Sequence, residues 1–85
     1  MKIWYVYVLQ SQHYKFRYVG MTQNLSQRLI SHNTGRVKST KPFKPFYVIY
    51  KESLDNSQDA RLREKYLKTS AGRKFINKFA GSPPD

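Results

Sequence analysis

The stretch RYVGMTQNLSQRLISHNTG at residues 17–35 decides the fold, because it contains in order a strand, a turn and a helix. Asn24 is a good helix N-cap, and Gln27 three residues later completes a variant of the capping box. Gly35 is typical of the position just past a helix C-terminus. Gly20 lacks a side chain, which permits an unusual backbone angle or a close approach by another group. The stretch therefore predicts a strand that ends at Gly20 and a helix that runs from Asn24 to Gly35.

Further strands and helices follow from the same kind of pattern. Residues 3–9 are rich in aromatic and β-branched side chains and apolar on both alternating faces, which predicts a central strand covered on both sides. A short polar loop separates it from the strand before Gly20, so the two form a hairpin. The predicted elements are strands at 3–9, 16–21 and 46–51, and helices at 24–35, at 57–68 and from a Ser70 cap onward. In the last helix, four residues have the spacing of a core face: Phe75, Ile76, Phe79 and Ala80.

The order of these elements, β-β-α-β-α-α, predicts a small α+β sandwich. Its sheet has three mainly antiparallel strands, and helices pack against it. A chain of 85 residues is large enough for one modest core. We expect one domain at residues 1–80 and a disordered tail at residues 81–85, where the sequence is Gly-Ser-Pro-Pro-Asp.

Charge is the strongest signal in the composition. The chain carries 16 Lys and Arg against 5 Asp and Glu, a net charge of +11, and no acidic residue precedes Glu52. Such a one-sided field favours a polyanionic partner, which predicts DNA or RNA. The basic loop at residues 35–45 supplies the expected phosphate contacts, namely Arg36, Lys38, Lys41 and Lys44. With no cysteine, no apolar membrane span and no signal peptide, a cytoplasmic protein without a membrane partner is expected.

Several polar residues stand where packing alone would not place them. At 100° per residue, Arg28 and His32 fall within about 60° of Leu25 on the inward face of their helix. Glu64 shares a face with Ala60 and Leu67 in the next helix. A buried carboxylate needs a cation, several hydrogen bonds or a proton. Each residue also has a structural explanation, as a solvated helix edge or an ion pair of Glu64 with a nearby Arg or Lys.

Taken together, these side chains suit hydrolysis of a phosphodiester. One carboxylate with water and substrate oxygens is the usual way to hold Mg²⁺. An arginine stabilises charge that develops on a phosphoryl oxygen. A histidine, or a tyrosine in cationic surroundings, takes a proton from attacking water. The tyrosines open to this role are Tyr18 and one of Tyr5 and Tyr7.

The same residues resemble the motifs of the GIY-YIG nuclease domain. The first motif reads Tyr5-Val6-Tyr7 and the second reads Tyr18-Val19-Gly20, with eleven residues from Tyr7 to Tyr18. Arg28 follows ten residues later, His32 four after that, and Glu64 lies further on. The resemblance extends over residues 3–67 and is closest to small stand-alone bacterial members, which are related to the N-terminal nuclease domain of the excision-repair endonuclease C subunit.

The resemblance implies a role for each matched position. Tyr7 or Tyr18 serves as or supports the general base, Arg28 stabilises the scissile phosphate, and His32 supports proton transfer or orients a tyrosine. Glu64 holds the divalent metal, Mg²⁺ or Mn²⁺. The implied function is that of a metal-dependent DNA endonuclease in repair or recombination, with a protein partner that supplies targeting. The alternative is a nucleic-acid-binding module that keeps the nuclease fold without significant cleavage.

Overall fold

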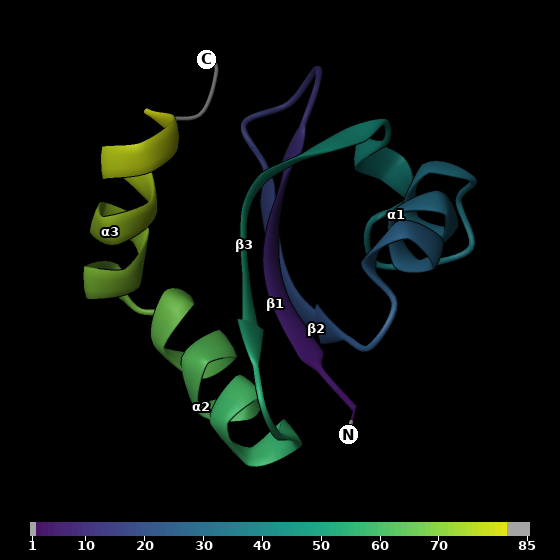
Figure 1. Cartoon of the computed structure of the whole chain (residues 1–85). Helices are drawn as coiled ribbons and strands as arrows, with labels where there is room; N and C mark the ends of the chain where they lie inside the picture. Colours follow the sequence, from purple (N-terminus) through teal and green to yellow (C-terminus); the bar gives the residue numbers. More distant parts are fainter. Residues whose placement is uncertain (1, 82–85) are drawn as a thin grey trace.

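The computed structural model describes residues 2–81 of the chain (Figure 1). Its elements have the predicted order β-β-α-β-α-α, with one short 3-10 helix inserted before the last strand. They are β1 (Trp4–Ser11), β2 (Arg17–Thr22), α1 (Leu25–Asn33), η1 (Lys41–Phe43), β3 (Phe46–Leu54), α2 (Ser57–Leu67) and α3 (Ser70–Ala80). The structure confirms the predicted α+β class.

The three strands form one antiparallel sheet in the order β2-β1-β3. β1 is therefore the central strand, as its apolar sequence predicts, and its residues from Val6 to Ser11 are buried. Tyr7 on β1 pairs with Gly20 on one side and with Lys51 on the other. This register places Tyr7 and Gly20 on the same face of the sheet, a point on which the site depends.

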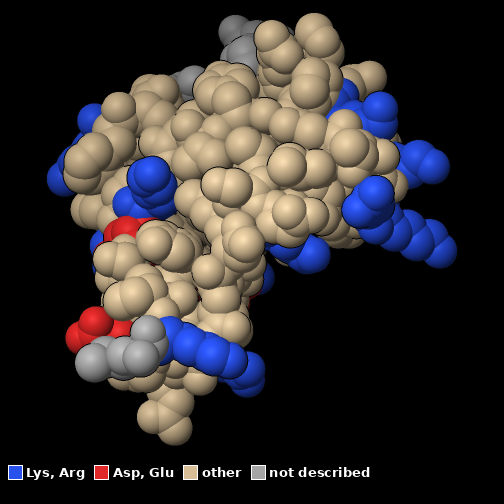
Figure 2. Space-filling model, turned by 45° about the vertical axis from the view of Figure 1, so that its right-hand side comes forward, with Lys and Arg blue, Asp and Glu red and all other residues tan. Residues whose placement is uncertain are grey.

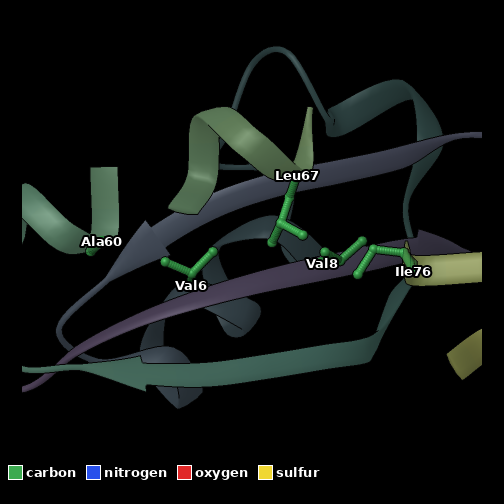
Figure 3. Close-up of a cluster of buried hydrophobic side chains, with 5 residues drawn as sticks. All are labelled: Val6, Val8, Ala60, Leu67 and Ile76. Atoms are coloured by element: carbon green, nitrogen blue, oxygen red, sulfur yellow. The ribbon is translucent and has the colours of Figure 1, made fainter. Parts of the chain in front are cut away.

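The helices cover both faces of the sheet. Figure 1 shows α1 on one side and α2 with α3 on the other. Because side chains alternate along a strand, β1 contributes to two separate cores. Val6 and Val8 pack with residues of α2 and α3 in one core (Figure 3). Tyr7 and Leu9 belong to the other core, on the α1 face, together with Phe46. The second core contains the candidate site.

Local side-chain hydrogen bonds start the helices. The Asn24 side chain accepts a hydrogen bond from the Gln27 amide at 3.1 Å, as the capping pattern predicts. Asn56 caps α2 in the same way. The expected Ser70 cap is wrong, because Thr69 holds that position and accepts from the Gly72 amide. The cap lies one residue earlier because Ser70 already has helical backbone geometry.

The C-terminal helix buries less than its sequence predicts. Ile76 is buried and Phe75 is half-buried, but Phe79 is 65% exposed and Ala80 is exposed. The Phe79 ring packs against Tyr50 and Phe75 only in part. Of the tail expected at 81–85, the structure describes Gly81, and residues 82–85 lie outside the described residues. Within residues 2–81, none of the helices combines the length and the apolar character needed to cross a membrane.

Candidate active site

The first feature of the site is the ring of Tyr7, which crosses β2 directly over Gly20. A Cβ atom added at Gly20 would lie 2.6 Å from the Tyr7 hydroxyl oxygen and 2.8 Å from Cε2 of Tyr18. Tyr7 is 1% exposed, so its ring has no free space into which to retreat. Gly20 was expected to end its strand, but β2 continues to Thr22. Its missing side chain instead permits the close approach of Tyr7.

Helix α1 presents two side chains to this tyrosine. The hydroxyl oxygen of Tyr7 lies 3.2 Å from Nε2 of His32, which is 0% exposed. The guanidinium of Arg28, one turn earlier on the helix, interacts with the hydroxyls of both Tyr7 and Tyr18. The ring of Tyr18 packs against His32, with ring centroids 4.8 Å apart. The structure thus brings together four of the predicted site residues on the α1 face of the sheet.

A residue that the sequence did not single out completes this arrangement. Thr40, in the loop between α1 and β3, is 0% exposed, and its Oγ1 lies 2.8 Å from Nδ1 of His32. The Thr40 hydroxyl also donates to the carbonyl oxygen of Val37 at 3.3 Å. A single threonine within a basic loop carries no pattern that distinguishes it from a surface residue. Only the folded loop shows that both ring nitrogens of His32 have partners.

Burial keeps both the tyrosine and the histidine of the site neutral, and the Arg28 charge adds to this effect at the histidine only. Burial raises the pKa of Tyr7, and the nearby Arg28 guanidinium only partly opposes this effect. For His32, burial first and then the positive charge of Arg28 lower the pKa to about 4. The interaction with Tyr7 raises the pKa of Arg28, so Arg28 stays charged. At neutral pH the site therefore consists of a neutral phenol, a neutral imidazole and one cation.

Glu64 approaches this group from α2, which packs on the opposite face of the sheet. Its side chain is 21% exposed, and one carboxylate oxygen lies 3.4 Å from the Lys68 ammonium. The structure gives it no direct contact with Tyr7, Arg28 or His32. Its negative charge nevertheless contributes to the raised pKa of Tyr7, which means that the two groups are electrostatic neighbours. The predicted inward carboxylate is thus half-buried at the border of the site.

The fit of a metal ion depends on this carboxylate. Within residues 2–81, no group of three or more His, Asp or Glu residues forms a metal-binding cluster. A site of one carboxylate that relies on water and substrate phosphate oxygens is nevertheless typical of Mg²⁺. Glu64 is partly open to solvent, and its one ion pair, with an exposed lysine, is of the weak surface type. Its chemistry therefore fits a weakly held divalent cation.

The four predicted phosphate-contact residues lie in the loop that contains Thr40. Arg36, Lys38, Lys41 and Lys44 are all exposed. Figure 2 shows Lys and Arg side chains at several places around this view of the molecule, on its right-hand side without neighbouring Asp or Glu and at its lower left next to acidic side chains. The loop is fixed at its ends, because the Asn33 side chain bonds to both backbone groups of Phe46. Its basic side chains therefore project from an anchored segment next to His32.

The loop is also fixed in its middle. The ring of Phe43 stacks on Phe16 with centroids 4.1 Å apart. Ser11 donates a hydrogen bond from its hydroxyl to the Phe43 carbonyl, and the Gln12 amide donates to the Pro45 carbonyl. These contacts join the loop to the turn between β1 and β2. The position of Thr40 under His32 is therefore set by the hairpin as well as by α1.

We predict that His32 stays neutral down to about pH 4 in the folded protein. In the unfolded chain a histidine binds its proton near pH 6.5. The unfolded state therefore binds more protons between these values, and the free energy of unfolding falls as pH drops through that window, by up to about 3 kcal/mol. NMR titration of the His32 ring, with urea unfolding at several pH values, measures both effects. Arg28→Gln should raise the pKa of His32, and a wild-type His32 that titrates near pH 6.5 would contradict the prediction.

Comparison with known proteins places these residues in a family. The sequence model of the GIY-YIG catalytic domain matches residues 3–78. The chain is 31% identical to a UPF0213 protein of Staphylococcus saprophyticus over 73 residues, which cover 85% of this chain and 88% of that protein. It is 37% identical to a UPF0213 protein of Clostridium perfringens over 65 residues, which cover 75% of this chain and 69% of that protein.

A solved structure supports the fold. The solution NMR structure of a UPF0213 protein from Bacillus halodurans superposes with a TM-score of 0.55 and 23% sequence identity, covering 95% of this chain and 88% of that chain. The match of the domain model over nearly the whole chain agrees with the motif residues that meet around Tyr7. The protein belongs to the GIY-YIG family, and its curated relatives are small UPF0213 proteins.

Proposed function

We propose that this protein is a divalent-metal-dependent endonuclease that hydrolyses phosphodiester bonds of DNA. The single observation that carries the proposal is the buried contact between the Tyr7 hydroxyl and Nε2 of His32, next to the Arg28 guanidinium. A hydroxyl that is hydrogen-bonded to a neutral imidazole is suited to pass protons, and a neighbouring guanidinium is suited to bind a phosphate. Membership of a family named for a catalytic domain supports the same chemistry.

The proposed reaction begins with a phosphate held by Arg28. Attack of water on phosphorus forms one P–O bond, and the bond to the leaving oxygen breaks. The Tyr7 hydroxyl accepts the proton of the attacking water while its own proton passes to Nε2 of His32. The leaving oxygen takes a proton from solvent, and His32 later returns its proton to the Tyr7 oxygen while Tyr7 releases the proton that it took from water. Because this relay does not require an ionised Tyr7 beforehand, the raised pKa of that residue is compatible with it.

The charge of the substrate prepares the histidine for this role. In the free protein the Arg28 cation is one of the two causes that lower the pKa of His32. A bound phosphate places negative charge beside Arg28, which offsets the effect of the cation on the imidazole. We therefore expect His32 to become a better proton acceptor when a phosphate is bound. Tyr18, which also interacts with Arg28, packs on the histidine and holds its ring in place.

Glu64 is the residue that would hold the metal ion, Mg²⁺ or Mn²⁺. When bound, such an ion stabilises negative charge on the phosphate and on the leaving oxygen. The charge of Glu64 is the smallest of the causes that raise the pKa of Tyr7, and its side chain is partly open to solvent. In a chain of net charge +11 it is one of only five acidic residues, and local cations oppose the binding of a further cation. We expect the metal to bind together with the substrate, whose phosphates supply additional oxygens.

We predict that Glu64→Gln and Arg28→Ala each slow the nicking of DNA by on the order of 10²–10³-fold, the range typical for loss of one charge-stabilising group. Tyr7→Phe should have an effect of at least similar size, because it removes the proton relay. The measurement is Mg²⁺- or Mn²⁺-dependent nicking of supercoiled and branched DNA. Glu52→Gln is the matched control, since that carboxylate pairs with Arg63 away from the site. If Glu64→Gln and Arg28→Ala nick as fast as wild type, the assigned site is wrong.

The second candidate function is a DNA- or RNA-binding module without significant turnover. Two observations favour it. The resting site holds no ionised base, because the pKa of Tyr7 is raised and that of His32 is lowered. The charge asymmetry and the exposed basic loop are sufficient for binding without catalysis. This candidate predicts binding that is unaffected by Glu64→Gln, with no metal-dependent cleavage.

Both candidates predict that the basic loop supplies the nucleic-acid contacts. The triple variant Lys38→Ala, Lys41→Ala, Lys44→Ala should weaken binding and reduce the slope of log affinity against log salt concentration by about 3, roughly one unit for each lost phosphate contact. Fluorescence anisotropy with labelled DNA and RNA at several salt concentrations measures this slope. The matched control removes three exposed lysines from the helices α2 and α3, as Lys65→Ala, Lys74→Ala, Lys78→Ala. An equal loss in both triple variants would show that the loop is not the contact surface.

A further inference from the structure

We propose that Thr40 is a positioning residue that, together with Tyr7, holds His32 in one tautomer, with the proton on Nδ1 and the lone pair of Nε2 directed at Tyr7. Its catalytic consequence rests on the proposed function, but the tautomer itself is a property of the folded protein. Which nitrogen of a neutral histidine carries the proton is set by the partner of the other nitrogen. In this site both partners of His32, Tyr7 and Thr40, are buried side chains, so their hydrogen bonds determine which nitrogen is protonated.

The proton of the Tyr7 hydroxyl needs an acceptor within the site. Tyr7 is 1% exposed, and His32 Nε2 at 3.2 Å is the hydrogen-bond partner that the described structure gives to its oxygen. The Arg28 guanidinium next to that oxygen has donors and no acceptor, whereas Tyr18 and Glu64 act on Tyr7 through their charge and form no hydrogen bond with it in the described structure. If Tyr7 donates its proton within the site, Nε2 must be the acceptor. An acceptor nitrogen in a neutral imidazole carries no proton, so the proton of His32 is on Nδ1.

The proton on Nδ1 of His32 also needs an acceptor. Its partner is Oγ1 of Thr40 at 2.8 Å, and Thr40 is completely buried. A hydroxyl oxygen accepts while its own proton is directed elsewhere. The carbonyl of Val37 receives that proton at 3.3 Å. The donations therefore run in one direction, from Tyr7 to His32, from His32 to Thr40 and from Thr40 to the backbone.

The reverse arrangement satisfies fewer groups. Thr40 would donate to Nδ1, and the proton on Nε2 would be directed at the Tyr7 oxygen. That oxygen would then face donors from both His32 and Arg28, and its own proton would have no acceptor among the described neighbours. The Val37 carbonyl does not decide between the two arrangements, because the Thr40 and Lys41 amides also donate to it. The difference therefore lies at the buried Tyr7 hydroxyl, where an unpaired donor is costly.

The place of Thr40 in the chain links this role to substrate binding. Lys38 and Lys41, two of the proposed phosphate contacts, flank Thr40 in the anchored loop. The same loop that positions the substrate therefore holds the histidine in the form that accepts a proton. A hydroxyl at position 40 is required for this, and Thr and Ser supply it where Val and Ala do not.

The test is ¹⁵N NMR of the His32 ring at pH 7, where the imidazole is neutral, in a His13→Gln background that leaves one histidine. Wild type and Thr40→Ser should show a protonated Nδ1 and a bare Nε2. Thr40→Val has nearly the shape of threonine but cannot accept from Nδ1–H, so the population with the proton on Nδ1 should fall and the two ¹⁵N shifts should move toward each other. Thr40→Ala provides a second variant without the hydroxyl if the valine side chain disturbs the loop.

Cleavage assays on the chain with both native histidines give the second readout. We expect Thr40→Val to lower kcat by on the order of 10–100-fold, a range seen when an outer partner that orients a histidine is removed. KM for DNA should stay unchanged, and Thr40→Ser should keep most of the activity. Thermal unfolding of each variant separates these effects from loss of fold.

The outcomes are distinguishable from one another. A wild-type His32 protonated on Nε2 overturns the proposal, as does a Thr40→Val protein whose tautomer equals that of wild type. A loss of cleavage without a change of tautomer also overturns it, because Thr40 would then act through loop packing alone. If the wild-type protein does not cleave DNA, the proposed function fails, while the NMR result still decides the role of Thr40.

Discussion

The close contact between Tyr7 and Gly20 is the constraint on which the rest of the site depends. The antiparallel register pairs the two residues and places both on the α1 face of the sheet. Because Gly20 has no side chain, the hydroxyl end of the Tyr7 ring lies close to Gly20 and reaches His32 on α1. Any larger residue at position 20 would occupy the space of that ring. The helix then needs to supply only Arg28 and His32 at one-turn spacing to complete the group.

The surface of the protein is strongly charged, whereas the tyrosine and the histidine of the site are neutral. The surface is strongly basic, with 16 Lys and Arg in the chain, which attracts a polyanion. Beneath it, the tyrosine and the histidine are held neutral by burial, and the Arg28 charge adds to this effect on the histidine. A phosphate that binds Arg28 reverses part of that influence. In the proposed function, His32 is therefore a weak base in the free protein and a stronger base when substrate is bound.

Much of the fold could be predicted from the sequence because its signals are local. The apolar run of β1, the Asn24 cap and the spacing of Arg28 and His32 all depend on neighbours within a few residues, and the structure contains each of them. Tyr7, Tyr18, Arg28 and His32 meet as one cluster. The border position of Glu64 was less predictable, because α2 packs on the opposite face of the sheet from α1.

What could not be predicted depends on contacts between distant segments. Thr40 reaches His32 only because its loop is tied to the β1–β2 turn and to Phe46. The sequence predicts Gly20 as a strand end. The close approach of Tyr7, which requires the glycine, comes from the neighbouring strand and has no local sequence signal. Phe79 had the spacing of a core residue, yet only part of its helix packs on the sheet. In each case the outcome depends on contacts between segments that are distant in the sequence.

The measurement that most directly tests the central claim is the nicking rate of Gly20→Ala, compared with Thr22→Ala on the same strand. The added methyl group displaces the Tyr7 hydroxyl from His32 without touching the basic loop. We expect unchanged affinity for DNA and nicking slowed by on the order of 10²-fold, the cost of misplacing a reacting group by about 1 Å. Thr22→Ala should nick at the wild-type rate. Wild-type nicking by Gly20→Ala would contradict the account, because the site would then not depend on Tyr7 lying over Gly20.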